Sequence, residues 1–176
     1  MKSKIMPTAV LGIICLVSAL LLALINIPTE AKIKENQSIK ENAALYEVYE
    51  TAGLFTPINN FADYDLPAEV TAVSAASNGG YVFKLEVSGY KPGLVIMCGV
   101  DGEGKITGVK DIASAETWGH ESYYNEAYVG TSSADLDRLV ASGATPNSET
   151  SKGYYNAMSA ALDAYATLTE KGVTGK

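Results

Sequence analysis

The sequence predicts an α+β protein with a single N-terminal transmembrane helix and one following domain, in which helices flank an antiparallel sheet. Three observations lead to this class. Residues 5–29 carry no charged side chain, the middle of the chain alternates polar and apolar residues, and the C-terminal part repeats apolar residues every three or four positions. The net charge of −7 gives no basic excess of the kind that nucleic-acid binding requires.

Residues 1–29 are predicted to be an N-terminal tail and transmembrane anchor. A helix over the uncharged run, roughly 25 residues, would rise more than 30 Å and cross the hydrocarbon core of a bilayer. The alternative is a cleaved signal peptide, whose apolar core is shorter and ends in small residues, whereas this run ends at Pro28, Thr29 and Glu30. The sequence therefore favours a single-pass anchor in the cell membrane. Lysines flank it on both sides, so charge does not decide its orientation.

Residues 30–53 mix charged and apolar residues at helical spacing, which predicts a juxtamembrane helix ending near Gly53. Both a solvated stalk and an element packed on the core fit this pattern. The remaining residues, 54–176, are numerous enough for one hydrophobic core. They begin with an expected connection over residues 55–60.

The sheet is predicted from residue 69 onward, with three or four antiparallel strands. Residues 81–87 alternate clearly, residues 94–100 form a more continuous apolar strand, and residues 106–112 return after a turn. We expect Cys98, within the second of these strands, to be a buried core residue rather than a nucleophile. One histidine and two separated cysteines supply no metal-ligand cluster.

Two helices are predicted at the C-terminal end, over residues 134–141 and about 151–171, with a short turn between them. The turn is rich in hydroxyl groups and small residues and stands where a helix begins. Backbone N–H groups and the helix dipole at such a place favour a phosphate. The same residue types also serve ordinary N-capping, which needs no ligand.

A second stretch, residues 115–126, gathers polar and aromatic side chains into one expected loop. This composition suits a planar ligand that is stacked and hydrogen-bonded at once. A surface loop whose Trp118 folds back into the core fits the composition equally well.

The stretch Ser142-Gly143-Ala144-Thr145, followed by a helix start rich in Ser and Thr, resembles a flavinylation motif. The motif belongs to the FMN-binding domain family shared by the FMN-carrying subunits of two complexes, the Rnf ion-translocating electron-transport complex and the sodium-translocating NADH:quinone reductase. In that family the last Thr carries FMN through a phosphoester bond. The resemblance thus implies an FMN-binding-type domain with covalent FMN on Thr145, and with Ser142, Gly143, Ala144 and Ser148 around the phosphate.

The family also has a Glu-Thr-Pro-Gly loop beside the isoalloxazine ring, and Glu116-Thr117-Trp118-Gly119 is similar to it at three of four positions. The resemblance therefore implies ring contacts from Glu116, Thr117 and Gly119. One departure is the family's Asp three residues before the motif Ser. Leu139 stands there in this chain, while Asp135 and Asp137 lie just upstream.

The function that the resemblance implies is electron transfer by a membrane-anchored flavoprotein, with the domain on the extracytoplasmic side. Its partners would be the other subunits of a membrane redox complex and the flavin transferase that attaches FMN. The sequence has no Gly-x-Gly-x-x-Gly turn for a nicotinamide cofactor, so we expect a carrier rather than a stand-alone enzyme. The alternatives are an unflavinylated structural or binding subunit, and a flavin carrier of another extracellular electron-transfer chain.

Overall fold

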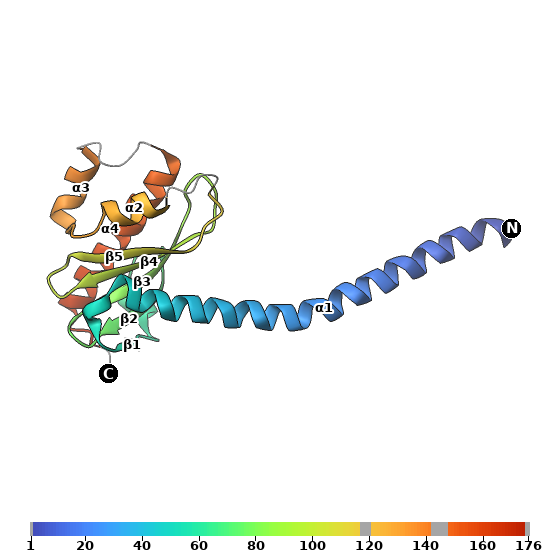
Figure 1. Ribbon diagram of the computed structural model, residues 1–176, viewed down its shortest axis with the longest axis horizontal. Helices are drawn as coiled ribbons and strands as arrows, with labels where there is room; N and C mark the ends of the chain where they lie inside the picture. The colour runs from blue at the N-terminus through green and yellow to red at the C-terminus, as the bar shows by residue number, and fades with distance from the viewer. Residues whose placement is uncertain (1, 117–120, 142–147, 175–176) are drawn as a thin grey trace. The chain divides into compact units, whose positions relative to one another are not determined.

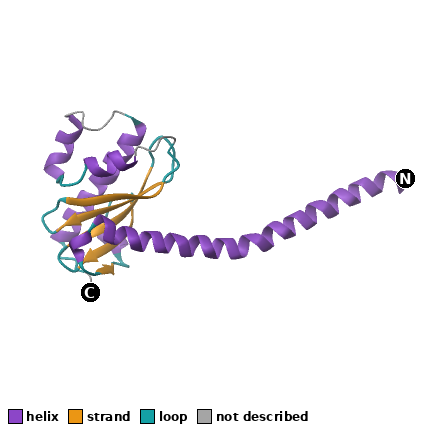
Figure 2. Cartoon of the chain, viewed as in Figure 1, coloured by secondary structure: helices purple, strands orange, loops and turns teal. Residues whose placement is uncertain are grey.

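The computed structural model describes residues 2–116, 121–141 and 148–174 (Figure 1). The chain divides into two compact units, Met1–Lys40 and Glu41–Lys176. Helix α1 (Lys2–Val48) makes up the first unit, and its last turns, from Glu41, belong to the second. All of the sheet and the remaining helices belong to the second unit (Figure 2).

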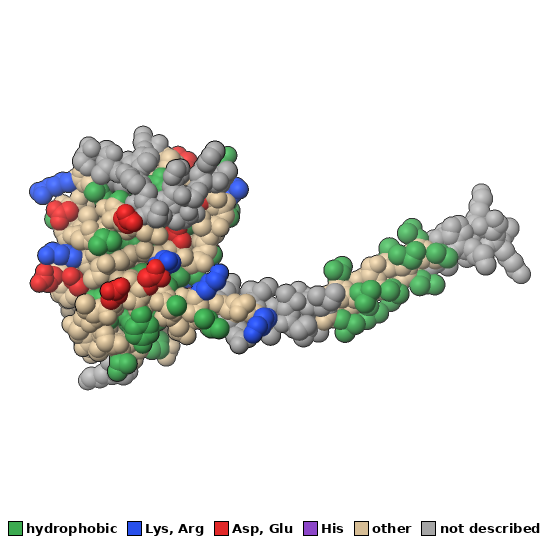
Figure 3. Space-filling view, in the orientation of Figure 1, with side chains coloured by type: hydrophobic (Ala, Val, Ile, Leu, Met, Phe, Trp, Pro, Cys, Tyr) green, Lys and Arg blue, Asp and Glu red, His purple; other side chains and the backbone are tan. Residues whose placement is uncertain are grey.

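The prediction of a transmembrane helix within residues 1–29 is wrong. Among the described residues, no helix combines the length and the apolar character that a membrane crossing requires. The apolar side chains described in this part of α1 lie within residues 10–24, where they are exposed (Figure 3).

The α+β class and the antiparallel sheet are confirmed. The sheet has five strands in the order β1-β2-β3-β4-β5, each antiparallel to its neighbour. Strands β2 to β5 follow one another through short connections, as antiparallel neighbours allow, whereas residues 58–69, with a short 3-10 helix at Phe61–Tyr64, connect β1 to β2. The prediction missed β1 and took its residues for a connection. The strands are β1 (Phe55–Pro57), β2 (Val70–Ala76), β3 (Gly80–Val87), β4 (Leu94–Asp101) and β5 (Ile106–Ala113).

Three helices follow the sheet: α2 (Glu121–Ala127), α3 (Ser133–Ala141) and α4 (Glu149–Glu170). Helix α4 packs on β3 and β4, α2 contacts β5, and α3 contacts α4. The predicted helices correspond to α3 and α4, and the expected apolar stripe of α4 includes the fully buried Tyr154, Met158 and Leu168. The predicted loop over residues 115–126 is wrong from residue 121 onward, where α2 begins.

We call the side of the sheet that α4 covers the α4 face. Alternate residues of the strands point to it, as a pleated strand requires, and Phe83, Leu85 and Ile96 are fully buried there. They form the main hydrophobic core together with the buried residues of α4. This core supports the first turn of α4, where the candidate site lies.

The opposite side, the α1 face, is covered by the end of α1. Val48 and Ala44 are buried there with Val82 and Met97, in a second and smaller cluster. Gly99 and Gly108 are cross-strand partners, and a Cβ atom on either would lie 2.6 Å from the carbonyl oxygen of Val48. The end of α1 thus contacts bare backbone and is a core element rather than a stalk.

Candidate functional site

The first turn of α4 begins directly after Ser148, one of the residues that the sequence predicted for the site. The Ser148 hydroxyl accepts a hydrogen bond from the backbone N–H of Ser151 at 3.1 Å and so caps the helix. It also lies 3.3 Å from the Tyr124 hydroxyl of α2. The other predicted residues of the turn, Ser142, Gly143, Ala144 and Thr145, lie outside the described residues.

Glu116, the first residue of the predicted ring-contacting loop, reaches the same turn of α4. Its Oε2 atom accepts a hydrogen bond from the Thr150 hydroxyl at 2.5 Å, although the two residues are 34 positions apart in sequence. Its Oε1 atom accepts one from the backbone N–H of Lys91, in the β3–β4 loop, at 3.0 Å. The fold thus joins Glu116 to the first turn of the helix that follows the Ser142-Gly143-Ala144-Thr145 stretch in the sequence. Thr117 and Gly119 lie outside the described residues.

The Glu116 carboxylate is stabilised in its charged form. Burial by itself raises the pKa of Glu116, but hydrogen bonds from the Thr150 side chain and from the Lys91 and Tyr90 backbone outweigh it. The net pKa is lower than the ordinary value for glutamate. A negative charge is therefore fixed beside the positive end of the α4 dipole, where it is favourable.

Two stacked tyrosines lie behind the first turn of α4. The rings of Tyr124 and Tyr154 are 4.6 Å apart at their centroids, with an interplanar angle of 20°. The Tyr154 hydroxyl donates to Oδ2 of Asp111, on β5, at 2.6 Å. Both rings are buried, so α2, α4 and β5 are held in one rigid arrangement. From the sequence, Tyr124 was predicted to lie in a loop, Thr150 was considered only as an alternative attachment residue, and Asp111 had no predicted part in a site, because nothing local connects them.

The acids near the predicted motif have different surroundings. Asp137 is exposed, and its Oδ1 atom accepts a hydrogen bond from the Tyr155 hydroxyl at 2.7 Å. This bond, followed by burial, raises the pKa of Tyr155. Leu139, which stands where the family has Asp, is half-buried against the main core. Asp135 accepts a hydrogen bond from the Ser132 hydroxyl at 2.7 Å, at the start of α3.

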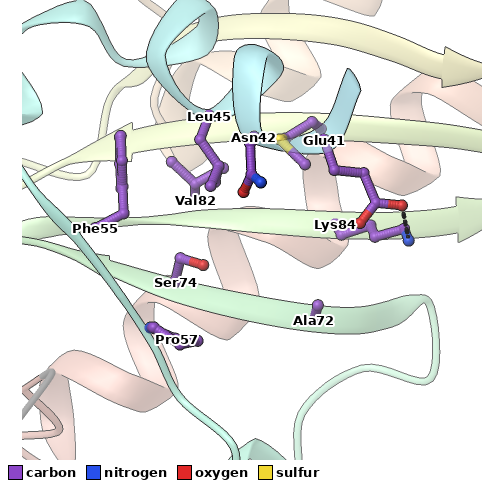
Figure 4. Close-up of a pocket in the computed structure, with 10 residues that line it drawn as sticks. Glu41, Asn42, Leu45, Phe55, Pro57, Ala72, Ser74, Val82 and Lys84 are labelled. Carbon is purple, nitrogen blue, oxygen red and sulfur yellow. Dashed lines mark hydrogen bonds and ion pairs between the residues drawn. The ribbon is translucent and has the colours of Figure 1, made fainter. Parts of the chain in front are cut away.

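One hollow lies on the α1 face, between the last turns of α1 and the sheet (Figure 4). It encloses about 250 Å³, and the ion pair between Glu41 and Lys84 lies at its edge, with 2.6 Å between Oε1 and Nζ. It lies across the sheet from α4, and its lining includes neither Glu116 nor Ser148, the two described residues of the predicted site. Its lining is Glu41, Asn42, Leu45, Phe55, Pro57, Ala72, Ser74, Val82, Lys84 and Met97.

A broader hollow of about 530 Å³ adjoins the β3–β4 loop and reaches Asn156 of α4. Its lining includes the carboxylates of Glu69 and Glu86 and no aromatic side chain. It therefore offers no surface on which a flavin ring could stack. The stacked tyrosines near the start of α4 are both buried, and the hydroxyl groups of Ser148 and Thr150 lie in the same region.

Cysteine and metal chemistry find no support in the described part of the chain. Cys98 is a buried core residue, as predicted, and burial raises the pKa of its thiol far above the usual range. No group of three or more His, Cys, Asp or Glu residues is arranged to hold a metal ion among the described residues.

Compared with protein-family models and with curated proteins, the sequence gives no match. A function for this chain is therefore inferred from the motifs and from the geometry around the first turn of α4.

Proposed function

We propose that this chain is an electron carrier in which FMN is attached through a phosphoester bond to Thr145, similar to the FMN-carrying subunit of the Rnf complex. One observation carries the proposal. Glu116, which opens one of the two motif-like stretches, hydrogen-bonds Thr150, which lies in the helix that begins just after the other. The first residue of one stretch therefore lies against the helix whose start follows the other stretch in the sequence.

The described residues around this place are chemically suited to the group. The start of a 22-residue helix provides the positive end of a dipole near the attachment residue. Thr145 would hold the phosphate beside Ser142, Gly143, Ala144 and Ser148, while Glu116, Thr117 and Gly119 would lie along the ring. Bound FMN would supply one- and two-electron redox chemistry. The tyrosine stack and the Ser148 cap keep the start of α4 in a fixed position.

The proposed setting is a membrane redox complex, with the domain on the extracytoplasmic side. Electrons would arrive from one partner and leave to another, and a flavin transferase would load FMN. Two alternatives from the sequence stand beside this: an unflavinylated structural or binding subunit, and a flavin carrier of a different extracellular chain. The replacement of the family's Asp by Leu139 favours the first alternative.

The decisive experiment is co-expression of the full chain with a flavin transferase, followed by a denaturing gel viewed for flavin fluorescence. The proposal expects a fluorescent band that Thr145→Ala abolishes and that Thr169→Ala, a matched threonine deletion at the exposed far end of α4, retains. A dark wild-type band would favour the unflavinylated alternative. A bright Thr145→Ala band would place the attachment at another hydroxyl.

The role of the upstream acid can be tested in the same assay. Asp137 is the exposed acid on α3, so Asp137→Ala should suppress labelling. Leu139→Asp should add little and should lower stability, because it places a carboxylate against the core. If Leu139→Asp instead raises labelling and Asp137→Ala has no effect, the transferase reads position 139.

A carrier and a dehydrogenase differ in their response to NADH. The labelled chain should be reduced by dithionite or by a redox partner, and NADH alone should not turn over. Rapid oxidation of NADH by the purified labelled chain would refute the carrier assignment.

A further inference from the structure

The carboxylate of Glu116 joins three segments of the domain. It lies just after β5, accepts from the Thr150 hydroxyl in the first turn of α4, and accepts from backbone N–H groups of Tyr90 and Lys91 in the β3–β4 loop. We call these contacts the Glu116 clamp. Hydrogen bonds to an ionised acceptor are stronger than those between neutral groups, so one side chain fixes both neighbouring segments.

Two glycines allow the clamp to close. A Cβ atom on Gly153 would lie 3.0 Å from the Cα atom of Gly89 and 3.0 Å from the carbonyl oxygen of Ser88. A Cβ atom on Gly89 would lie 2.7 Å from Oε1 of Glu116 and 3.1 Å from the Cα atom of Thr150. The β3–β4 loop and α4 therefore meet backbone to backbone, which only glycine permits at these two positions.

The same carboxylate had been expected to contact the flavin ring, but its two oxygen atoms are already engaged. Oε2 holds Thr150 and Oε1 holds Lys91. The half-buried side chain is charged at neutral pH, and its pKa is lower than usual because of these partners. Its effect on residue 145 would pass through Thr150 and the helix start.

We propose that Glu116 is a positioning residue, which locks the first turn of α4 to the β3–β4 loop and so fixes the helix start that follows Thr145 in the sequence. This inference rests on the proposed function for its consequence, the loading of FMN, but the clamp itself does not depend on FMN. Because the link from the β3–β4 loop to α4 passes through the hydrogen bond between Glu116 and Thr150, the loss of either partner breaks that link. Thr150 is thus as important for loading as Glu116.

The first measurement is hydrogen–deuterium exchange on the full, unlabelled chain, read by mass spectrometry. Glu116→Gln and Thr150→Val should each raise exchange about tenfold or more over residues 88–93 and 149–153, as the loss of a hydrogen bond to a charged group implies. Thr150→Ser keeps the hydroxyl group and should leave the exchange rates unchanged. Glu149→Gln removes a neighbouring charge, paired with Lys152 at 2.6 Å, and is the matched control. Unchanged exchange in Glu116→Gln and Thr150→Val would overturn the clamp.

The second measurement is the rate of labelling by the flavin transferase in the same variants and in the double variant. Glu116→Gln and Thr150→Val should each slow labelling about tenfold, and combining them should slow it no further, because both remove the same bond. Slow labelling in Glu116→Gln alone would overturn the positioning role and indicate direct contact with FMN or the transferase. Exchange that rises while labelling stays at the wild-type rate would also overturn it.

A third measurement, the flavin midpoint potential, separates the positioning effect of Glu116 from the effect of its negative charge. In the labelled protein, Glu116→Gln should shift the flavin midpoint potential to a more positive value, since it removes a fixed negative charge, while Thr150→Val keeps that charge. A wild-type chain that takes no label overturns the proposed function. The clamp is then still judged by the exchange data alone.

Discussion

The two faces of the sheet are held to their covering helices by different forces. On the α4 face, large apolar side chains such as Phe83 and Met158 are fully buried in one continuous core. On the α1 face, the apolar cluster is small, and the small side chains of Ala72 and Ser74 help to line a hollow of about 250 Å³. The candidate site belongs to the face with the stronger packing.

Polar contacts replace packing on the α1 face. The Thr107 hydroxyl donates to the Val48 carbonyl oxygen at 2.6 Å, and Lys84 and Lys110 pair with Glu41 and Glu47 of α1. Such contacts are directional, but exposed ion pairs contribute little free energy. The larger apolar core of the domain thus lies on the α4 face and runs along the length of α4.

The largest change in the free energy of unfolding should come from replacing a buried methionine by alanine, and the two faces each offer one methionine for this comparison. Met158→Ala should lower the free energy of unfolding by about 3–5 kcal/mol, because the cavity it leaves is fully enclosed. Met97→Ala should cost about 2 kcal/mol or less, since Met97 already borders the hollow. Urea titration measures both. Equal losses would show that the two faces are packed equally well.

Gly99→Ala tests the contact between α1 and the sheet. The added Cβ atom would lie 2.4 Å from the Thr107 hydroxyl oxygen and 2.6 Å from the Val48 carbonyl oxygen, so α1 must shift. We expect a loss of about 1–3 kcal/mol in urea unfolding. Gly12→Ala is the control, because nothing lies within 4 Å of its added Cβ atom, and alanine favours a helix. An unchanged Gly99→Ala protein would mean that the end of α1 is not seated on the sheet.

The ion pairs of the α1 face should contribute less. A double-mutant cycle on Glu41 and Lys84, whose side chains are 33% and 28% exposed, should give a coupling of up to about 1 kcal/mol. The Glu47–Lys110 pair is 55% and 44% exposed and should give about half as much or less. Both couplings should fall at high salt. A larger coupling for the more exposed pair would contradict this order.

The smallest effect concerns the polar contact between α3 and α4. The hydrogen bond to Asp137, and then burial, raises the pKa of Tyr155, so folding favours its protonated form. The corresponding stability is present below pH ~10 and is lost as pH rises through the higher folded-state pKa. In a titration of phenolate absorbance, Tyr155→Phe should remove one late-titrating tyrosine, with unfolding free energy almost unchanged at neutral pH. Loss of an early-titrating tyrosine instead would contradict the assignment.

The sequence predicted those elements whose own residues repeat with a regular period, and it missed the short elements that have no such period. Strand β3 alternates over eight residues and was found, whereas β1 has three residues, one of them Pro57, and offers no period to detect. Helix α2 has seven residues, rich in polar and tyrosine side chains, and was taken for a loop. Apolar composition alone led to the transmembrane helix, which the described residues contradict.

The site was predictable only in part, for a related reason. The hydroxyl-rich start of α4 shows in the sequence because capping is local, and Ser148 does cap the helix. The bond between Glu116 and Thr150 and the contact between Gly89 and Gly153 depend on how distant segments pack. The periodicity of the sequence gives no sign of these two contacts, because they form only when the chain folds.

The capping of α4 also has a consequence for selectivity. Residues 142–151 carry several hydroxyl groups, and an esterifying enzyme could in principle modify any of them. The fold engages the later ones: Ser148 accepts from the Ser151 backbone, Thr150 donates to Glu116, and Ser151 is buried. The fold therefore acts as a protecting group for these hydroxyl groups, because hydrogen bonds and burial make them less accessible to an esterifying enzyme. Ser142 and Thr145 lie outside the described residues, and an acceptor displaced from Thr145 should be sought at Ser142 before Ser148 or Thr150, whose hydroxyl groups are engaged.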